Sequence, residues 1–174
     1  MTQAEEDNRR HPSPRSAAAT ESTAPTRSPP EEMQIQFPSS PEYLALLRPL
    51  VEWFARKCRF DEKEASRIVL CVVEAVTNVI RHAYGGDAGQ RITLQLRELG
   101  AGIEVQILDD GKSVAPGTLD KPPCQELTPG GLGVRMMRSC MDHFEYAPRP
   151  EGGSRLVLRK LHKTPTNAPG EAGS

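Results

Sequence analysis

Glu74, Asn78 and His82 stand four residues apart in a segment whose other side chains are mostly apolar. Positions four apart lie one above another on an α-helix, so a helix here would carry these groups in one polar row. Burying a carboxylate and an amide without partners costs free energy. The row therefore either bonds to the local backbone or faces a wet cleft that holds a ligand.

Asp109 and Gly111 form a second candidate group, directly after an alternating apolar segment. A carboxylate at the end of a strand can accept a hydrogen bond from an exocyclic amine. A glycine two residues later lets the backbone approach a flat ring closely. The alternative is an ordinary Asp-Gly turn, which is common.

Gly130, Gly131 and Gly133 form a glycine-rich turn directly before a predicted helix. Such a turn exposes backbone N–H groups, and a helix N-terminus attracts anions, which suits a triphosphate. The segment lacks the Gly-Lys-Ser/Thr of a Walker motif, and no strand leads directly into it as in a Rossmann fingerprint. Taken alone, this loop could equally be a flexible hinge.

Hydrophobic periodicity predicts the helix that would position the first group. This helix is expected to begin at Asp61, where Asp61 and Glu64 form a capping-box-like pair. It is expected to end near Tyr84, because Gly85 and Gly86 follow.

The remaining elements complete the predicted fold. A helix is expected from Ser40 and Pro41 to Phe54, with a capping serine and with a kink or a break at Pro49. Strands are expected at 33–37, 92–96, 103–107, 144–147 and 155–161, and a short helix at 132–141. This order predicts an α/β protein, a two-layer sandwich with a mixed, mainly antiparallel sheet and helices on one face.

Composition limits the alternatives. The 174 residues are expected to form one domain at 33–163, with disordered tails at 1–32 and 164–174 that are poor in large apolar residues. A net charge of -1 gives no global attraction to nucleic acid or anionic lipid, and no apolar stretch is long enough to span a bilayer. The cysteines lack metal-ligand spacing, which predicts reduced thiols in a cytoplasmic protein; they are Cys58, Cys71, Cys124 and Cys140.

The three groups occur in an order that is more specific than any one of them. Glu-x-x-x-Asn on a helix, Asp-x-Gly after a strand and Gly-x-Gly before a helix resemble the GHKL ATPase superfamily, which has the Bergerat ATP-binding fold. Segments 74–84, 130–142 and 152–160 are similar to motifs of bacterial anti-sigma-factor serine kinases of the RsbW type. Ser113 departs from the glycine that many GHKL proteins carry, and 112–129 matches nothing closely.

The resemblance implies catalytic and metal-binding roles. Asn78 would bind a Mg²⁺ ion that bridges the phosphates of ATP. Glu74 would be the general base that accepts the proton of a serine hydroxyl. His82 would orient a water or a phosphate, or it is a helix-end histidine satisfied by backbone. Trp53, Tyr84 and Phe144 are expected to pack in the core or in a lid.

The resemblance also implies how the nucleotide is held. Asp109 would accept a hydrogen bond from the adenine amino group, and Gly111 would let the base lie flat. The loop that contains Gly130, Gly131 and Gly133 would contact the phosphates through backbone N–H groups.

By resemblance, the chain is expected to be an ATP-dependent serine/threonine kinase that phosphorylates an anti-sigma-factor antagonist of the STAS type. The alternative is an ATP-binding anti-sigma module that sequesters a sigma factor with little or no kinase activity. Either protein is expected to be a homodimer that contacts neither nucleic acid nor membrane directly. A detached sensor-kinase domain is disfavoured because no helix pair with a phospho-accepting histidine is apparent.

Overall fold

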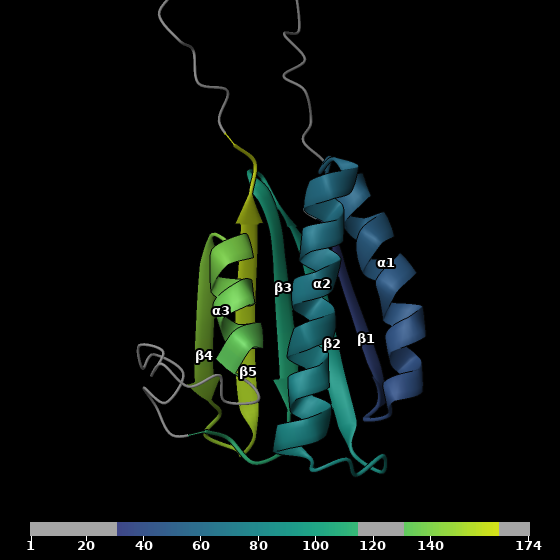
Figure 1. Ribbon diagram of the computed structural model, residues 1–174, viewed down its shortest axis with the longest axis vertical. Coiled ribbons are helices and arrows are strands. Elements are labelled where there is room, and N and C mark those ends of the chain that lie inside the picture. The colour runs from purple at the N-terminus through teal and green to yellow at the C-terminus, as the bar shows by residue number, and fades with distance from the viewer. Residues whose placement is uncertain (1–30, 115–130, 164–174) are drawn as a thin grey trace, which may run out of the picture.

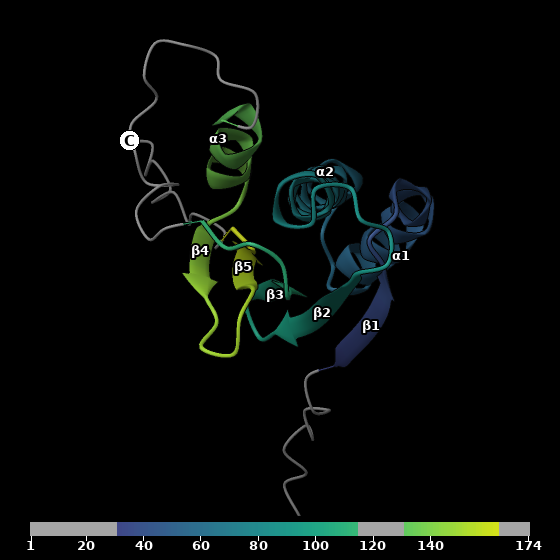
Figure 2. The same ribbon diagram turned by 90° about the horizontal axis from the view of Figure 1, so that it is seen from below.

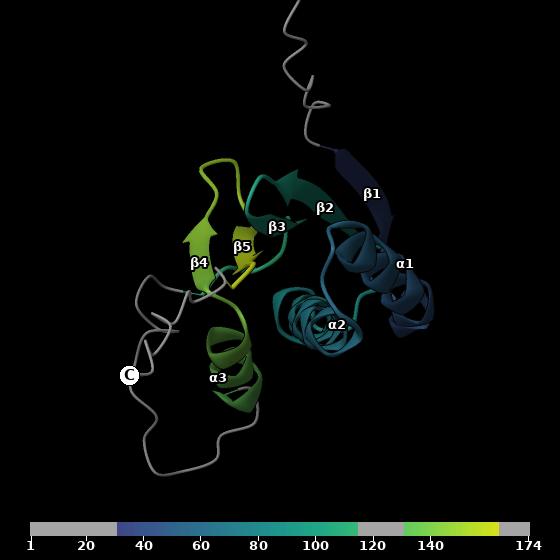
Figure 3. The same cartoon turned by 90° about the horizontal axis from the view of Figure 1, so that it is seen from above.

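The structure is a computed structural model that describes residues 31–114 and 131–163. These residues form two layers, with a five-stranded sheet behind three helices (Figure 1). The helices all lie on one side of the sheet in both end views (Figure 2, Figure 3). The predicted two-layer sandwich is therefore confirmed.

The sheet has the strand order β1-β2-β3-β5-β4. Every strand pairing among the described residues is antiparallel, so the mixed component of the prediction is absent from this part of the chain. The strands are β1 (Glu32–Pro38), β2 (Arg91–Leu99), β3 (Gly102–Asp109), β4 (His143–Pro148) and β5 (Ser154–Leu161). The helices are the 3₁₀ turn η1 (Pro41–Tyr43), α1 (Leu44–Lys57), α2 (Glu62–Asn78), the π-helical turn η2 (Val79–Ala83) and α3 (Gly131–Cys140).

Helix α2 begins where the sequence predicts, and the continuous helical segment α2–η2 ends at Ala83, next to the predicted end near Tyr84. The Asp61 carboxylate accepts a hydrogen bond from the Glu64 N–H at 2.8 Å, which satisfies one of the free donors of the first turn. The last turn differs from the prediction because it is π-helical, with the Tyr84 N–H bonded to the Val79 carbonyl. Gly85 then adopts a φ of 62°, a left-handed conformation that ends the helix.

The serine cap predicted for the first helix is absent, and of the two outcomes predicted at Pro49, a kink or a break, the break does not occur. Ser40 precedes a 3₁₀ turn and makes no side-chain capping bond; its hydroxyl lies 3.3 Å from the Glu42 carboxylate instead. Helix α1 is also not broken at Pro49. Pro49 lies on the exposed side of the helix, where water can bond to the Ala45 carbonyl that the proline leaves without a donor.

The core lies between the sheet and α2. Alternate residues of the two central strands point toward the helices and are at most 1% exposed; they are Ile92, Leu94, Leu96, Ile103, Val105 and Ile107. They meet the apolar face of α2, where Ile68, Val72 and Val76 are fully buried. Each such side chain contributes about 1.5–3 kcal/mol by burial, so α2 is held firmly beside the end of β3.

The described cysteines are free thiols, as predicted; they are Cys58, Cys71 and Cys140. Burial raises the pKa of Cys58 to about 11 and the pKa of Cys71 to about 12. Cys124 and the two predicted tails lie outside the described residues, apart from Glu31 and Glu32. Within 31–114 and 131–163, every helix is too short or too polar to cross a membrane.

The sheet face opposite the helices carries a row of charges across neighbouring strands. Glu104 is 4% exposed and lies between Arg97, at 3.7 Å, and Arg159, at 2.6 Å. Burial raises the pKa of the Glu104 carboxyl, but hydrogen bonds from Gln106 and Arg159 and the two positive charges outweigh it. The net effect is a pKa below the usual range.

We expect Glu104→Gln to destabilise the protein by about 1 kcal/mol at pH 7, since both arginines lose their shared partner. A depressed carboxyl pKa stabilises the fold above the unfolded pKa, and that contribution is lost as pH falls through the folded pKa. The difference in the free energy of unfolding between wild type and variant, measured with urea, should therefore become smaller below about pH 4. Glu32→Gln, on an exposed carboxylate in the same row, is the control. If the difference in the free energy of unfolding does not change with pH, the lost stability comes from packing and not from the charge of Glu104.

Candidate nucleotide-binding site

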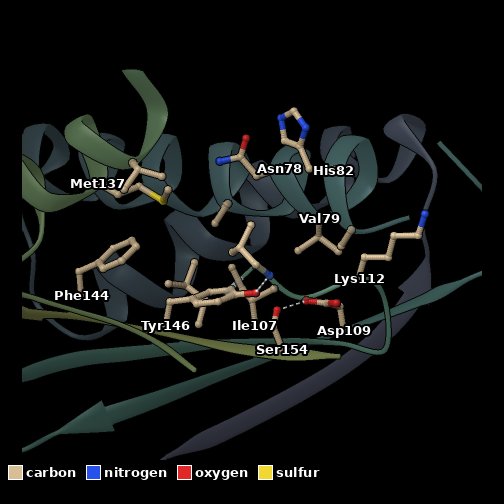
Figure 4. A pocket seen from close by; sticks show the side chains of 15 residues that line it. Asn78, Val79, His82, Ile107, Asp109, Lys112, Met137, Phe144, Tyr146 and Ser154 are labelled. Atoms are coloured by element: carbon tan, nitrogen blue, oxygen red, sulfur yellow. Dashed lines mark hydrogen bonds between the residues drawn. The ribbon is translucent and has the colours of Figure 1, made fainter. Parts of the chain in front are cut away.

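A pocket of about 280 Å³ lies where α2 and η2 face α3 and the ends of β3, β4 and β5. Its polar lining includes Asn78, His82, Asp109, Lys112, Tyr146 and Ser154 (Figure 4). Apolar side chains such as Ile107 and Met137 form much of the remainder. An apolar cavity with a few convergent polar groups is typical of a small-molecule site.

Asp109 places a buried carboxylate at this pocket, with 2% of the residue exposed. One carboxylate oxygen accepts a hydrogen bond from the Gly111 N–H at 2.9 Å, and the other accepts from the Ser154 hydroxyl at 2.5 Å. Each oxygen keeps a further lone pair. The carboxylate is thus fixed in orientation and can still accept a hydrogen bond from a ligand amine.

Ser154 is a site residue that sequence reasoning missed. It lies opposite Asp109 in the pairing of β3 with β5, so the two side chains meet across the sheet. Their hydrogen bond is drawn in Figure 4. The only signal in the sequence is its place directly after Gly152-Gly153, at the start of a predicted strand.

Gly111 makes a close contact that the sequence did not predict. A Cβ atom at this position would lie 2.7 Å from the carbonyl oxygen of Ala83 in η2, which is too close for any side chain. The next N–H, that of Lys112, donates to the same carbonyl at 3.0 Å. Gly111 is not among the pocket-lining residues, so its smallness lets the loop after β3 pack against η2.

Asn78 and His82 extend from the same side of the helix at the pocket (Figure 4). In the described part of the chain, neither side chain makes a hydrogen bond. The same holds for Glu74. Satisfaction by the local backbone, which the sequence left open, is therefore not what these residues do; on α2 it is Thr77 that bonds to the Val73 carbonyl, at 2.7 Å.

Glu74 lies one helical turn before Asn78 and does not line the pocket. It faces α3 instead, where Gly133 is buried. A Cβ atom on Gly133 would overlap the Glu74 carboxylate. Gly131 is the first residue of α3, and Gly130 lies outside the described residues. Glu74 therefore lies against the glycine segment at Gly133, whereas Asn78 and Asp109 line the same pocket.

Lys112 and Tyr146 also line the pocket, although the sequence analysis named neither. The Tyr146 hydroxyl accepts a hydrogen bond from the Val114 N–H at 2.9 Å, where the described part of the loop ends. Phe144, expected in the core or a lid, is a pocket residue as well. Alternation along β4 puts Phe144 and Tyr146 on the helix-covered side of the sheet, and this is the signal that could have identified them.

These groups fit an adenine nucleotide with Mg²⁺. The apolar walls suit a base, and the oriented Asp109 carboxylate suits an exocyclic amine. The described residues contain no cluster of three His, Cys, Asp or Glu that could hold a metal alone. Mg²⁺ commonly takes one or two protein oxygens and fills its other positions with water and phosphate. The amide oxygen of Asn78, without another partner in the described structure, meets that need.

Comparisons with known proteins agree with this fit. Residues 37–160 match the family described as histidine kinase-like ATPase domain. The serine-protein kinase RsbW of Bacillus mycoides is 27% identical over 142 residues, which cover 76% of this chain and 87% of that protein. RsbW of Halalkalibacterium halodurans is 29% identical over 140 residues, covering 76% of this chain and 84% of that protein.

Among solved structures, the blue-light activated histidine kinase of Erythrobacter litoralis EL346 is 23% identical with a TM-score of 0.44, covering 57% of this chain and 30% of that one. The family match spans both the strand that carries Asp109 and the helix that carries Glu74 and Asn78. By this match, the chain belongs to the histidine kinase-like ATPase domain family.

Proposed function

We propose that this chain is an ATP-dependent protein serine/threonine kinase that phosphorylates an anti-sigma-factor antagonist of the STAS type and so controls a sigma factor. One observation carries the proposal: Glu74 and Asn78 lie one turn apart without hydrogen-bond partners in the described structure, beside a pocket with a buried carboxylate. The relatives named serine-protein kinase RsbW support the choice of serine as acceptor.

Recognition of the base falls to Asp109 and Ser154. The Ser154 hydroxyl donates to one oxygen of the carboxylate, so Asp109 is oriented before any ligand arrives. A carboxylate accepts hydrogen bonds and does not donate them, so where it meets the 6 position of a purine it favours an amino group over an oxo group. Adenine nucleotides should therefore bind in preference to guanine nucleotides.

The phosphates would lie toward Asn78 and the start of α3. Asn78 would hold Mg²⁺ through its amide oxygen, and the bound ion would neutralise phosphate charge. The first N–H groups of α3 have no partner within the helix, and they favour an anion there. His82 and Lys112 line the same pocket and add donors for phosphate or ribose oxygens.

Glu74 would accept the proton of the acceptor hydroxyl. Its carboxylate lies against Gly133, on the α3 side of the helix rather than in the base pocket. A general base at that place is separate from the Asp109 carboxylate. Nucleobase recognition and proton transfer would therefore use different carboxylates. Phosphoryl transfer depends mainly on positioning and charge neutralisation, which makes one carboxylate sufficient.

The test is transfer of labelled γ-phosphate to a panel of purified STAS-domain proteins, comparing wild type with Glu74→Gln. The variant should transfer about 100-fold more slowly, while its ATP affinity stays within a factor of about three. Glu52→Gln, on an exposed carboxylate of α1, is the control and should transfer normally. Equal transfer by wild type and Glu74→Gln would refute the role of Glu74.

A second function is favoured by the position of Glu74 against Gly133, outside the pocket. In that reading the chain is an ATP-responsive anti-sigma module with little kinase activity. The two are separated in the same experiment by adding purified sigma factors with ATP or with ADP. Nucleotide-dependent capture of a sigma factor without phosphate transfer to any STAS protein would replace the kinase proposal by this one.

A further inference from the structure

The peptide group between Asp109 and Asp110 is held from both ends by side chains of other elements. Its carbonyl oxygen, on Asp109, accepts a hydrogen bond from an Arg149 guanidinium N–H at 3.2 Å. Its N–H, on Asp110, donates to the Tyr84 hydroxyl at 2.7 Å. Neither Arg149 nor Tyr84 is among the residues that line the pocket.

Arg149 lies in the turn between β4 and β5 and is itself fixed in place. Its guanidinium pairs with the Glu151 carboxylate at 2.7 Å and with the Asp110 carboxylate at 3.0 Å. Its backbone N–H donates to the Gly153 carbonyl at 3.0 Å. Gly153 has a φ of 77°, and a Cβ atom there would overlap the Asp109 carbonyl oxygen. The turn therefore packs directly against the backbone of Asp109.

Tyr84 approaches the same peptide group from the end of η2. Its hydroxyl accepts from the Asp110 N–H and donates to the Arg91 carbonyl at 2.6 Å. Burial raises the pKa of this hydroxyl, which therefore stays protonated and can do both. The contacts of Arg149 and Tyr84 thus connect β2, the end of η2 and the β4–β5 turn at the Asp109–Asp110 peptide group.

Stability alone is a poor account of the Arg149 contacts. The Asp110 carboxylate is 71% exposed, and an ion pair to an exposed carboxylate contributes little to folding. The hydrogen bond to the Asp109 carbonyl acts differently, because the orientation of that peptide plane sets ψ of Asp109. The backbone angles of Asp109 in turn decide where its buried carboxylate points.

We propose that Arg149 and Tyr84 are positioning residues for nucleobase recognition: by fixing the Asp109–Asp110 peptide group, they align the Asp109 carboxylate with the exocyclic amine of the base. The inference rests on the proposed ATP-binding function and extends it to two residues outside the pocket. It is a case of preorganisation, in which a binding group is ordered before the ligand arrives.

The test compares two nucleotides as their magnesium complexes, ATP and purine riboside triphosphate, which lacks the 6-amino group. Calorimetry on the full chain gives both affinities for wild type, Arg149→Ala and Tyr84→Phe. Wild type should favour ATP about tenfold or more. Each variant should lose about fivefold in ATP affinity and less than twofold for the analogue, so the preference falls. Arg149→Lys, which keeps a donor, should restore part of it.

Arg155→Ala is the matched control, because Arg155 pairs with Glu145 at 2.8 Å and does not line the pocket. Its preference for ATP should equal that of wild type. Equal losses for both nucleotides would assign Arg149 and Tyr84 a purely structural role and overturn the inference. An unchanged preference in both variants would overturn it too.

The failure of this inference is distinguishable from failure of the proposed function. If wild type binds neither nucleotide at millimolar concentration, the ATP site itself is refuted. If wild type binds and prefers ATP while the variants do the same, only the positioning role falls. Should Arg149→Ala not fold, Tyr84→Phe decides, because it removes one oxygen atom and keeps the ring.

Discussion

Replacing Asn78 by alanine is expected to abolish the dependence of ATP affinity on Mg²⁺. Asn78 lines the pocket and makes no hydrogen bond within the described residues, so its amide is available to a ligand and costs little to remove from the fold. In wild type, ATP should bind roughly 30-fold more tightly with Mg²⁺ than with a chelator, a difference of about 2 kcal/mol. In the variant the two affinities should agree within a factor of about two.

Calorimetric titration with ATP, in Mg²⁺ or in chelator, measures this directly and needs no acceptor protein. Thr77→Ala is the neighbouring control on α2, because its hydroxyl bonds to the Val73 carbonyl and it does not line the pocket. That control should keep the full Mg²⁺ effect. A large Mg²⁺ effect that survives in Asn78→Ala would remove Asn78 from the metal site and leave the base pocket unaffected.

Local sequence signals were sufficient to predict the elements of this fold. Alternation located the two central strands, and a capping carboxylate at Asp61 and the glycines at 85 and 86 located both ends of the α2–η2 helix. These features depend on residues that are close together in the chain, so they can be recognised in the sequence alone. Pro49 does not break α1, because the rule against proline in helices weakens where that side of the helix faces water.

The candidate site was predictable only in part. Asn78, His82 and Asp109 were named from the sequence, and the structure brings them to one pocket. Ser154 and Arg149 were not named, because their contacts with Asp109 depend on the pairing of β3 with β5 and on the turn between β4 and β5. Arg149 and Ser154 lie 40 and 45 residues from Asp109, and contacts over such distances produce no periodic pattern in the sequence.

Exposure of the single tryptophan could not be read from the sequence either. Trp53 was expected in the core or in a lid, yet it is 51% exposed on α1, with Lys57 over its ring at 5.2 Å. Helical periodicity predicts one apolar face, but it does not predict that Leu46 and Trp53 of α1 are exposed outside that face. Which side is buried depends on the sheet that the helix meets.

Replacing Gly133 by alanine is expected to slow phosphate transfer while leaving the fold as stable as before or more so. The new Cβ atom would overlap the end of the Glu74 side chain, which can swing away, rather than rigid backbone. Alanine is also a better helix former than glycine by about 1 kcal/mol, and Gly133 lies within α3. Stability and activity should therefore change in opposite directions.

The measurement pairs a thermal unfolding midpoint with the rate of labelled γ-phosphate transfer. The midpoint should stay level or rise, and the rate should fall at least about tenfold because the Glu74 carboxylate is displaced. Ser139→Ala, on the exposed side of α3, should leave the rate unchanged. Combining Gly133→Ala with Glu74→Gln adds a decisive step: if glycine acts only by leaving room for that carboxylate, the double variant should be no slower than Glu74→Gln alone. A further loss in the double variant would mean that Gly133 contacts the phosphates or the acceptor independently of Glu74.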